Sequence, residues 1–128
     1  METLVHDPAG DVYATGDDYV HALELRTPQR LLLVSGTMGL APDAAAGASL
    51  AEQLELVWSN LRAILASAGM TIDHVVRVTS YLRDAAYAEA NAAARVAALG
   101  GRAVPTTAIV VQTLEPDWLV ELEVIAAA

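Results

Sequence analysis

Two acidic residues near the C-terminus, Glu121 and Glu123, have the spacing that places both on one face of a strand. They alternate with aliphatic residues across Leu119–Ala126, which predicts that strand. The segment His74–Leu82 predicts a second strand, whose polar face would carry Arg77, Thr79 and Tyr81. A carboxylate that is partly withdrawn from water can accept a proton from a bound water molecule. Acid–base chemistry is therefore within the reach of these residue types.

Several other kinds of chemistry are excluded by residue content. The chain has no cysteine, which rules out disulfides, thiolate nucleophiles and cysteine-ligated metals. The three histidines, at positions 6, 21 and 74, lack the spacing of metal ligands. No Ser-His-Asp arrangement and no phosphate-binding loop is visible. We therefore expect no metal site.

Length and composition predict a single domain over residues 1–128. Hydrophobic residues make up 55% of the chain and aromatic residues only 5%, so the core must be aliphatic. A small domain this apolar is expected to bury further surface between subunits. No signal peptide and no bilayer-spanning run is present, which predicts a soluble cytoplasmic protein.

Charge argues against two classes of partner. The net charge is −9, and the seven basic residues, all arginine, are scattered along the chain. Such a surface repels phosphate backbones and anionic lipids, so we expect neither nucleic acid nor membrane binding.

The expected elements follow the order ββαβαββ. Val20–Arg26 and Arg30–Gly36 predict a hairpin, and Thr106–Val111 predicts a strand that precedes the last one. Ser49–Ala68 predicts a helix with a capping box and an apolar stripe, and Asp84–Leu99 predicts a second, alanine-rich helix. Two helices should pack on one face of the mixed sheet and leave a half-polar face as a candidate subunit interface.

Four blocks together resemble the reactive intermediate deaminase (Rid, or YjgF-like) family. They are LLLVSGTMGLAPD (31–43), the helix, Ala-Gly turn and strand of 49–84, VPTTAIVVQTL (104–114) and VELEVIA (120–126). The resemblance covers roughly residues 15–126, and its specificity comes from the order and spacing of the blocks.

This resemblance implies an α+β, chorismate-mutase-like fold. It also implies a homotrimer whose sheets line a central barrel and whose small-molecule clefts lie between neighbouring subunits. The best-known members hydrolyse enamines and imines, such as 2-aminoacrylate and 2-iminopropanoate, to ketoacids and ammonia. They use no cofactor and no metal.

Site residues carried over from the family form a polar cleft. Tyr19 matches the cleft tyrosine, and His21 stands where the family has glutamine. Ser35 and Gly36 match a Ser-Gly turn whose backbone lines the cleft, although a turn glycine alone explains the pair equally well. Tyr19 is alternatively an amphipathic interface residue.

Two further matches concern the second helix and the last strand. Asn91 matches an asparagine near the ligand, or is a surface helix residue. Glu121 matches the glutamate that orients or activates the attacking water. The alternative for Glu121 is an interfacial salt bridge with Arg77.

The main departure from the family is the arginine that holds the substrate carboxylate. Its place is taken by Thr106, or by Thr107 in a register shifted by one, and threonine cannot form a charged bidentate pair. Arg102 in a glycine-rich approach, or His21, is a possible substitute.

The sequence leaves two functions open. The first is a cofactor-free, deaminase-like hydrolase whose substrate is an imine, enamine or related metabolite other than 2-iminopropanoate. The second is a non-catalytic trimer that binds a metabolite in the same cleft. A nucleic-acid role, suggested by an old endoribonuclease label of the family, conflicts with the charge of −9.

Overall fold

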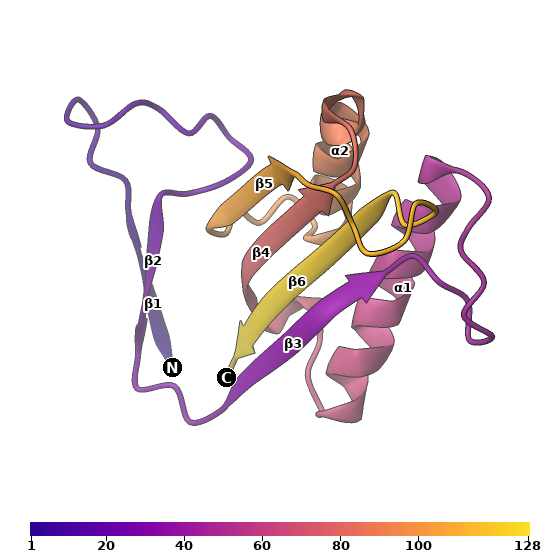
Figure 1. Ribbon diagram of the computed structural model, residues 1–128. Helices are drawn as coiled ribbons and strands as arrows, with labels where there is room; N and C mark the ends of the chain where they lie inside the picture. Colours follow the sequence, from indigo (N-terminus) through magenta and orange to yellow (C-terminus); the bar gives the residue numbers. More distant parts are fainter.

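A four-stranded mixed sheet and two helices form the body of the protein in a computed structural model that describes residues 1–128 (Figure 1). The sheet order is β3-β6-β4-β5. The bounds are Leu31–Met38 for β3, Val120–Ala127 for β6, Val75–Leu82 for β4 and Thr106–Val110 for β5. β6 runs antiparallel to both of its neighbours, and β5 runs parallel to β4. The last strand of the chain, β6, therefore lies inside the sheet, between β3 and β4.

The first helix, α1 (Leu50–Ser67), begins where the sequence predicts. The Ser49 hydroxyl accepts a hydrogen bond from the N–H of Glu52 at 3.2 Å, as a capping residue does. The Glu52 carboxylate accepts from the N–H of Ala48 at 2.8 Å, one residue earlier than in the usual capping box. Gly69, with φ +69°, follows the last turn in a conformation that suits glycine. Local signals thus fix both ends of α1.

The second helix, α2 (Ala88–Ala98), starts later than predicted. The Asp84 carboxylate accepts from the N–H of Ala86 at 2.9 Å and caps a single 3₁₀ turn, Ala85–Tyr87, that leads into the helix. Neither α1 nor α2 combines the length and apolarity needed to cross a membrane.

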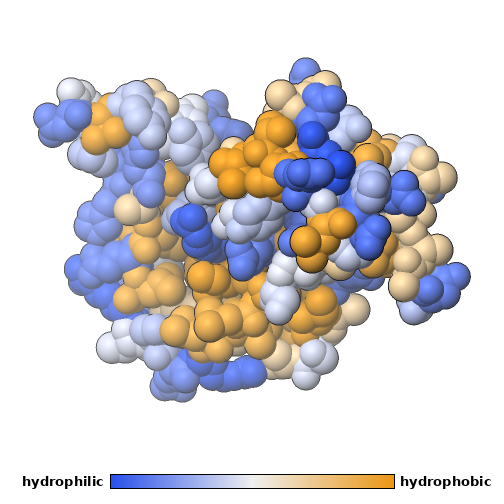
Figure 2. Space-filling view, in the orientation of Figure 1, coloured by the Kyte–Doolittle hydropathy of each residue, from blue (hydrophilic) through white to orange (hydrophobic).

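Both helices cover the same side of the sheet (Figure 1), which confirms the predicted α+β arrangement. The core between helices and sheet is mainly aliphatic, with Trp58 as a buried aromatic residue, and its largest fully buried side chains include Leu61, Leu65, Val78, Leu82 and Leu122. The opposite side, called the open face below, carries the polar residues predicted for it, Arg77, Thr79, Tyr81, Glu121 and Glu123. Figure 2 shows polar and apolar groups mixed on this side of the molecule.

The predicted hairpin between residues 20–26 and 30–36 is wrong. Strand β2 (Ala22–Arg26) pairs instead with an N-terminal strand that the sequence analysis did not assign, β1 (Glu2–His6). The intervening Thr27 has φ +52°, and the N–H groups of Gln29 and Arg30 both donate to the C-terminal carbonyl of Ala128. The chain therefore turns toward the end of β6, and β3 pairs with β6 rather than with β2.

The two-stranded ribbon of β1 and β2 stands beside the sheet (Figure 1). One side of the ribbon is polar: Glu24 accepts from Arg26 and lies 2.7 Å from His6, and Arg26 also reaches Glu2 at 3.3 Å. These contacts lower the pKa of Glu24, chiefly through the bond from Arg26 and then through that from His6. The other side carries Thr3, Val5, Leu23 and Leu25. A two-stranded ribbon is only marginally stable alone, so this apolar side is expected to need a partner surface.

Candidate functional site

The carboxylate of Glu121 lies directly against Gly36. Glu121 is on β6, and Gly36 lies where the pairing of β3 with β6 shifts register, between Val34 and Thr37. A Cβ atom at position 36 would overlap the carboxylate and lie 2.9 Å from its carboxyl carbon. A side chain at position 36 would therefore require the end of the Glu121 side chain to move. The bulge in β3 and the glycine together let the strand backbone and the carboxylate share one small volume.

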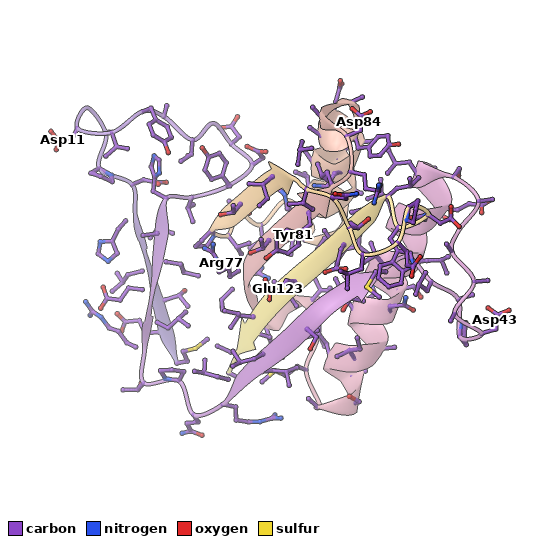
Figure 3. All side chains as sticks on the ribbon, viewed as in Figure 1. Asp11, Asp43, Arg77, Tyr81, Asp84 and Glu123 are labelled. Atoms are coloured by element: carbon purple, nitrogen blue, oxygen red, sulfur yellow. The ribbon has the colours of Figure 1, made fainter.

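A hydrogen bond orients the second glutamate of the open face. Tyr81 is opposite Glu121 in the β4–β6 register, and its hydroxyl donates to Oε1 of Glu123 at 2.9 Å (Figure 3). This bond raises the pKa of Tyr81 above its ordinary value, and desolvation and the charges of the two glutamates act in the same direction. Arg77 acts in the opposite direction. Tyr81 is thus a neutral donor that fixes the Glu123 carboxylate.

A pocket of about 200 Å³ opens beside these groups. Its walls are Gly36, Tyr81, residues 111–114 and the two glutamates. Ligand pockets usually measure about 300–1,000 Å³, so this volume suits a few heavy atoms and a water molecule.

A half-buried arginine and a buried glutamine, neither of them predicted as site residues from the sequence, hold the segment that follows β5 beside this pocket. Arg83 donates to the carbonyl of Thr113 at 3.1 Å and to its hydroxyl oxygen at 2.8 Å. Gln53, only 2% exposed, donates to the carbonyl of Asp117 at 2.7 Å and accepts from the N–H of Leu119 at 2.9 Å. Gln53 is a polar residue on the otherwise apolar buried side of α1, and this departure from the apolar pattern is the sequence signal that could have identified it.

Thr106 and Thr107, which the sequence resemblance placed at the position of the family arginine, begin β5. The Thr106 hydroxyl donates to a backbone carbonyl two residues earlier at 3.0 Å. Thr107 pairs with Thr79 on the open face, and its hydroxyl oxygen accepts from Nη2 of Arg77 at 3.2 Å. Regular strand spacing puts the Cα atoms of Thr107 and Glu121 roughly 12 Å apart. A threonine side chain cannot span that separation, so the two parts of the predicted site stay apart in one chain.

Tyr19 lies near the start of β5. The N–H of the next residue, Val20, donates to the carbonyl of Val104, just before β5, at 3.4 Å. Arg95 on α2 donates to the carbonyl of Asp18 at 2.6 Å and to its carboxylate at 2.9 Å. The ring of His21 is 6.2 Å from that of Tyr19, and its Nε2 lies 2.7 Å from a backbone carbonyl of the preceding loop. Tyr19 is therefore held on the Thr107 side of the sheet, away from the Glu121 pocket.

Asn91 and Arg102 do not line the pocket beside Glu121. Asn91 is 2% exposed, and its Oδ1 has no hydrogen-bond partner within the chain. Arg102 donates to the carbonyls of Ile72 at 2.7 Å and Val75 at 2.9 Å. These bonds occupy its guanidinium in fastening the approach to β5 onto the start of β4.

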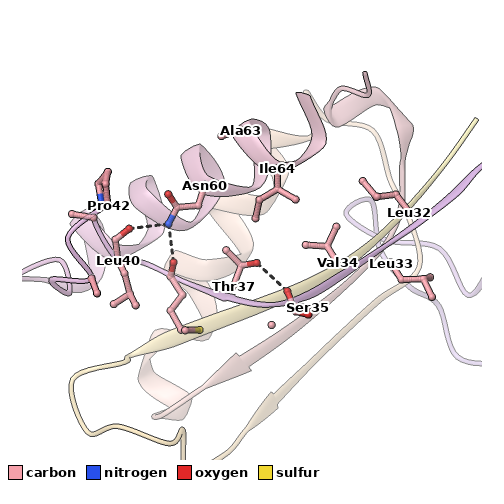
Figure 4. Close-up of a pocket in the computed structure, with 14 residues that line it drawn as sticks. Leu32, Leu33, Val34, Ser35, Thr37, Leu40, Pro42, Asn60, Ala63 and Ile64 are labelled. Carbon is pink, nitrogen blue, oxygen red and sulfur yellow. Dashed lines mark hydrogen bonds between the residues drawn. The ribbon is translucent and has the colours of Figure 1, made fainter. Parts of the chain in front are cut away.

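A larger cavity of about 640 Å³ lies between α1 and the free edge of β3 (Figure 4). Its lining is mostly apolar. Asn60 closes one end by donating to the carbonyls of Met38 at 3.1 Å and Leu40 at 2.9 Å. Ser35 and Gly36 belong to this cavity, and Gly36 also belongs to the smaller pocket. Ser35 and Gly36, which the resemblance matched to a turn, lie instead within β3, between an apolar space and a polar one.

The chain is similar in sequence and in structure to proteins of one family. The family model described as Endoribonuclease L-PSP matches residues 11–128. The chain belongs to this family. A structure from Yersinia pestis, a Rid-family protein of unknown function called YyfB, is similar with a TM-score of 0.86, 28% identity and full coverage of both chains. RidA from an Antarctic Psychrobacter is similar with a TM-score of 0.73 and 26% identity over 91% of this chain and 92% of that one.

A curated relative supports the same assignment. The RutC family protein YjgH of Escherichia coli is 41% identical over 54 residues, which span 42% of this chain and 41% of that protein. These matches confirm the predicted Rid (YjgF-like) family and its α+β fold. This member of the Endoribonuclease L-PSP family has threonine at positions 106 and 107.

Proposed function

We propose that this protein is a cofactor-free hydrolase that acts on an imine, an enamine or a related reactive metabolite. The contact between Glu121 and Gly36 is the observation that carries the proposal. It keeps a carboxylate in a small pocket beside strand backbone, with a second carboxylate and a tyrosine nearby. Such a group can hold one water molecule and take its proton.

The reaction needs only water and this carboxylate. The imine reacts in its N-protonated form. Glu121 removes a proton from water as the oxygen forms a bond to the imine carbon, and the C=N electron pair moves to nitrogen, which gives a neutral carbinolamine. Glu121 then returns this proton to the nitrogen, ammonia leaves as an oxygen lone pair forms the carbonyl, and the hydroxyl proton passes to solvent, so the carboxylate is regenerated.

The complete cleft forms between subunits of a homotrimer. Within one chain, Glu121 and Gly36 lie apart from Tyr19 and Thr107, so a neighbouring copy is needed to bring the two groups together. The exposure of Leu33, 74%, and of Leu31, 60%, beside the free edge of β3 supports a surface that another copy covers.

The substrate differs from the usual small imino acid. No arginine stands at position 106 or 107, and the Arg102 guanidinium is bonded to backbone carbonyls. Loss of a charge-assisted bidentate pair typically costs about 1.5–3 kcal/mol or more, which weakens the binding of a small anion at that position. A larger or differently charged metabolite suits the cleft better.

A non-catalytic metabolite-binding trimer is the competing function, and the replacement of the arginine favours it. The net charge of −9 argues against a nucleic-acid role, because a negatively charged protein repels the phosphate backbone. The proposed reaction is tested by assaying the purified protein with enzymatically generated 2-iminopropanoate and with a series of larger imines. We expect little activity on 2-iminopropanoate and turnover of at least one larger imine. Binding without turnover of any imine would instead identify a binding protein.

A further inference from the structure

Tyr19 lies in a segment with few backbone hydrogen bonds of its own. Residues 14–19 belong to no helix or strand, and none of their N–H groups donates to a backbone carbonyl. Such a segment lacks the ladder of bonds that keeps a helix or a strand rigid. Its conformation therefore depends on contacts from other parts of the chain.

One such contact comes from α2. Arg95 donates through Nη1 to the carbonyl of Asp18 at 2.6 Å and through Nη2 to its carboxylate at 2.9 Å. The Arg95 side chain is only 5% exposed, whereas that of Asp18 is 42% exposed. A buried guanidinium is costly unless a partner compensates its charge and accepts its hydrogen bonds. Asp18 does both, with its backbone and its side chain together.

The residue after Tyr19 is fastened as well. Val20 is buried, its N–H donates to the carbonyl of Val104, and it forms an isolated parallel bridge with Pro105. Tyr19 thus lies between one residue that α2 holds and one that the approach to β5 holds. Because the backbone is fixed on both sides of Tyr19, these two contacts set the direction of its side chain.

Arg95 occupies a place in α2 that an apolar residue would ordinarily take. The buried residues of α2 are Asn91 and Arg95, four positions apart on one face, and Leu99 continues that face in the next turn. The polar end of Arg95 adds no apolar contact to the core. Its burial instead delivers two hydrogen bonds to the segment that carries Tyr19.

We propose that Arg95 is a positioning residue for the ligand cleft, which acts through Asp18 on Tyr19. It holds the Tyr19 ring in the direction in which the completed cleft receives the ligand. The importance of Tyr19 for the ligand rests on the proposed function, whereas the coupling of Arg95 to Tyr19 depends on no reaction. The contact is buried within one chain, so the association of subunits leaves it in place.

Fluorine NMR of the full-length protein tests this coupling without a substrate. Incorporated 3-fluorotyrosine marks the four tyrosines, and Tyr19→Phe identifies the Tyr19 signal. Arg95→Met removes both bonds but fills a similar volume, so the protein should stay folded while the Tyr19 signal shifts or broadens. Asp18→Ala should cause a smaller change, because the bond to the carbonyl remains. Arg95→Lys keeps the charge without the fork and should restore part of the native signal.

Leu99→Ala is the matched control, because it removes a buried side chain from the same face of α2 and leaves both bonds to Asp18 in place. It should lower the Tm and leave the Tyr19 signal at its native position. Sedimentation should show the same assembly for all variants. The proposal is overturned by an unchanged Tyr19 signal in Arg95→Met, by an equal change in Leu99→Ala, or by a change that accompanies dissociation of the assembly.

Kinetics test the consequence for the cleft, with the imine that an amino acid oxidase forms from L-leucine as the probe. Arg95→Met should raise KM at least about tenfold and leave kcat within about threefold, because Glu121 keeps its place. A fall in kcat at unchanged KM would contradict a positioning role. If the native protein does not hydrolyse this imine, the proposed reaction fails for this substrate, and the fluorine signal still decides whether Arg95 positions Tyr19.

Discussion

At the scale of single residues, uncharged neighbours set the surroundings of the charged groups on the open face. Gly36 matters because a side chain there would collide with the Glu121 carboxylate. Thr107 matters because its hydroxyl accepts a hydrogen bond from Arg77 of the neighbouring strand. The positive charge beside Thr107 therefore comes from β4.

Tyr81 should ionise above the ordinary pKa of tyrosine. Its bond to the Glu123 carboxylate favours the neutral phenol, so its pKa in the folded protein lies above the ordinary value of 10.0. The stabilisation from this bond is fully present below pH 10 and is lost as the pH rises through the raised pKa. Ultraviolet titration near 295 nm should show one late tyrosine among the four. Glu123→Gln should move that transition to lower pH, and an unchanged curve would contradict the assignment.

At the scale of elements, local signals were predictable from the sequence and long-range pairing was not. The capping residue Ser49 and the apolar stripe of α1 are close in sequence, so they specified the helix correctly. The partner of β2 depended on Thr27 and on bonds to Ala128, about a hundred residues away along the chain, so a hairpin with β3 was predicted instead.

The same distinction applies to the candidate site: the face that its side chains share could be predicted from the sequence, and the contacts between strands could not. Alternation within β6 placed Glu121 and Glu123 on one face, and the structure agrees. The contact of Glu121 with Gly36 depends on a bulge in β3, which no local pattern indicates. The bond between Arg77 and Thr107 depends on the parallel pairing of β4 with β5. Both contacts join segments that only the folded sheet brings together.

Gln53 should be worth more to stability than its surface neighbours on α1. Gln53→Ala removes bonds to the carbonyls of Gly47 and Asp117 and to the N–H of Leu119, and leaves these groups unsatisfied. We expect a loss of about 1–3 kcal/mol in the free energy of unfolding by urea. Glu55→Ala on the exposed side of the same helix should cost less than about 0.5 kcal/mol. Equal losses in the two variants would contradict the stabilising role of the Gln53 hydrogen bonds.

At the scale of the whole molecule, the chain presents surfaces that are incomplete alone. The ribbon of β1 and β2 has an apolar side, β3 has a free edge, and the predicted site residues lie in two separate groups. A closed ring of identical copies covers free edges and joins separate surfaces without leaving one end unpaired. A trimer satisfies these requirements and agrees with the family resemblance.

Sedimentation equilibrium tests the assembly directly. We expect a species of three times the 13.4 kDa chain at micromolar concentration. Leu33→Asp places a charge on a strongly exposed apolar position beside the free edge of β3 and should weaken this species. A stable monomer of the native protein under these conditions would contradict the proposed inter-subunit cleft.

Glu121 is the proposed general base, and one substitution tests this role most directly. Glu121→Gln keeps the shape of the side chain and its place beside Gly36 but removes the basic group. With any imine that the native protein hydrolyses, kcat should fall by about 10²–10⁴-fold while the trimer remains assembled. Glu123→Gln should cause a smaller loss. Full activity of Glu121→Gln would contradict the general-base role, and dissociation of the trimer by this substitution would show that Glu121 is an interface residue instead.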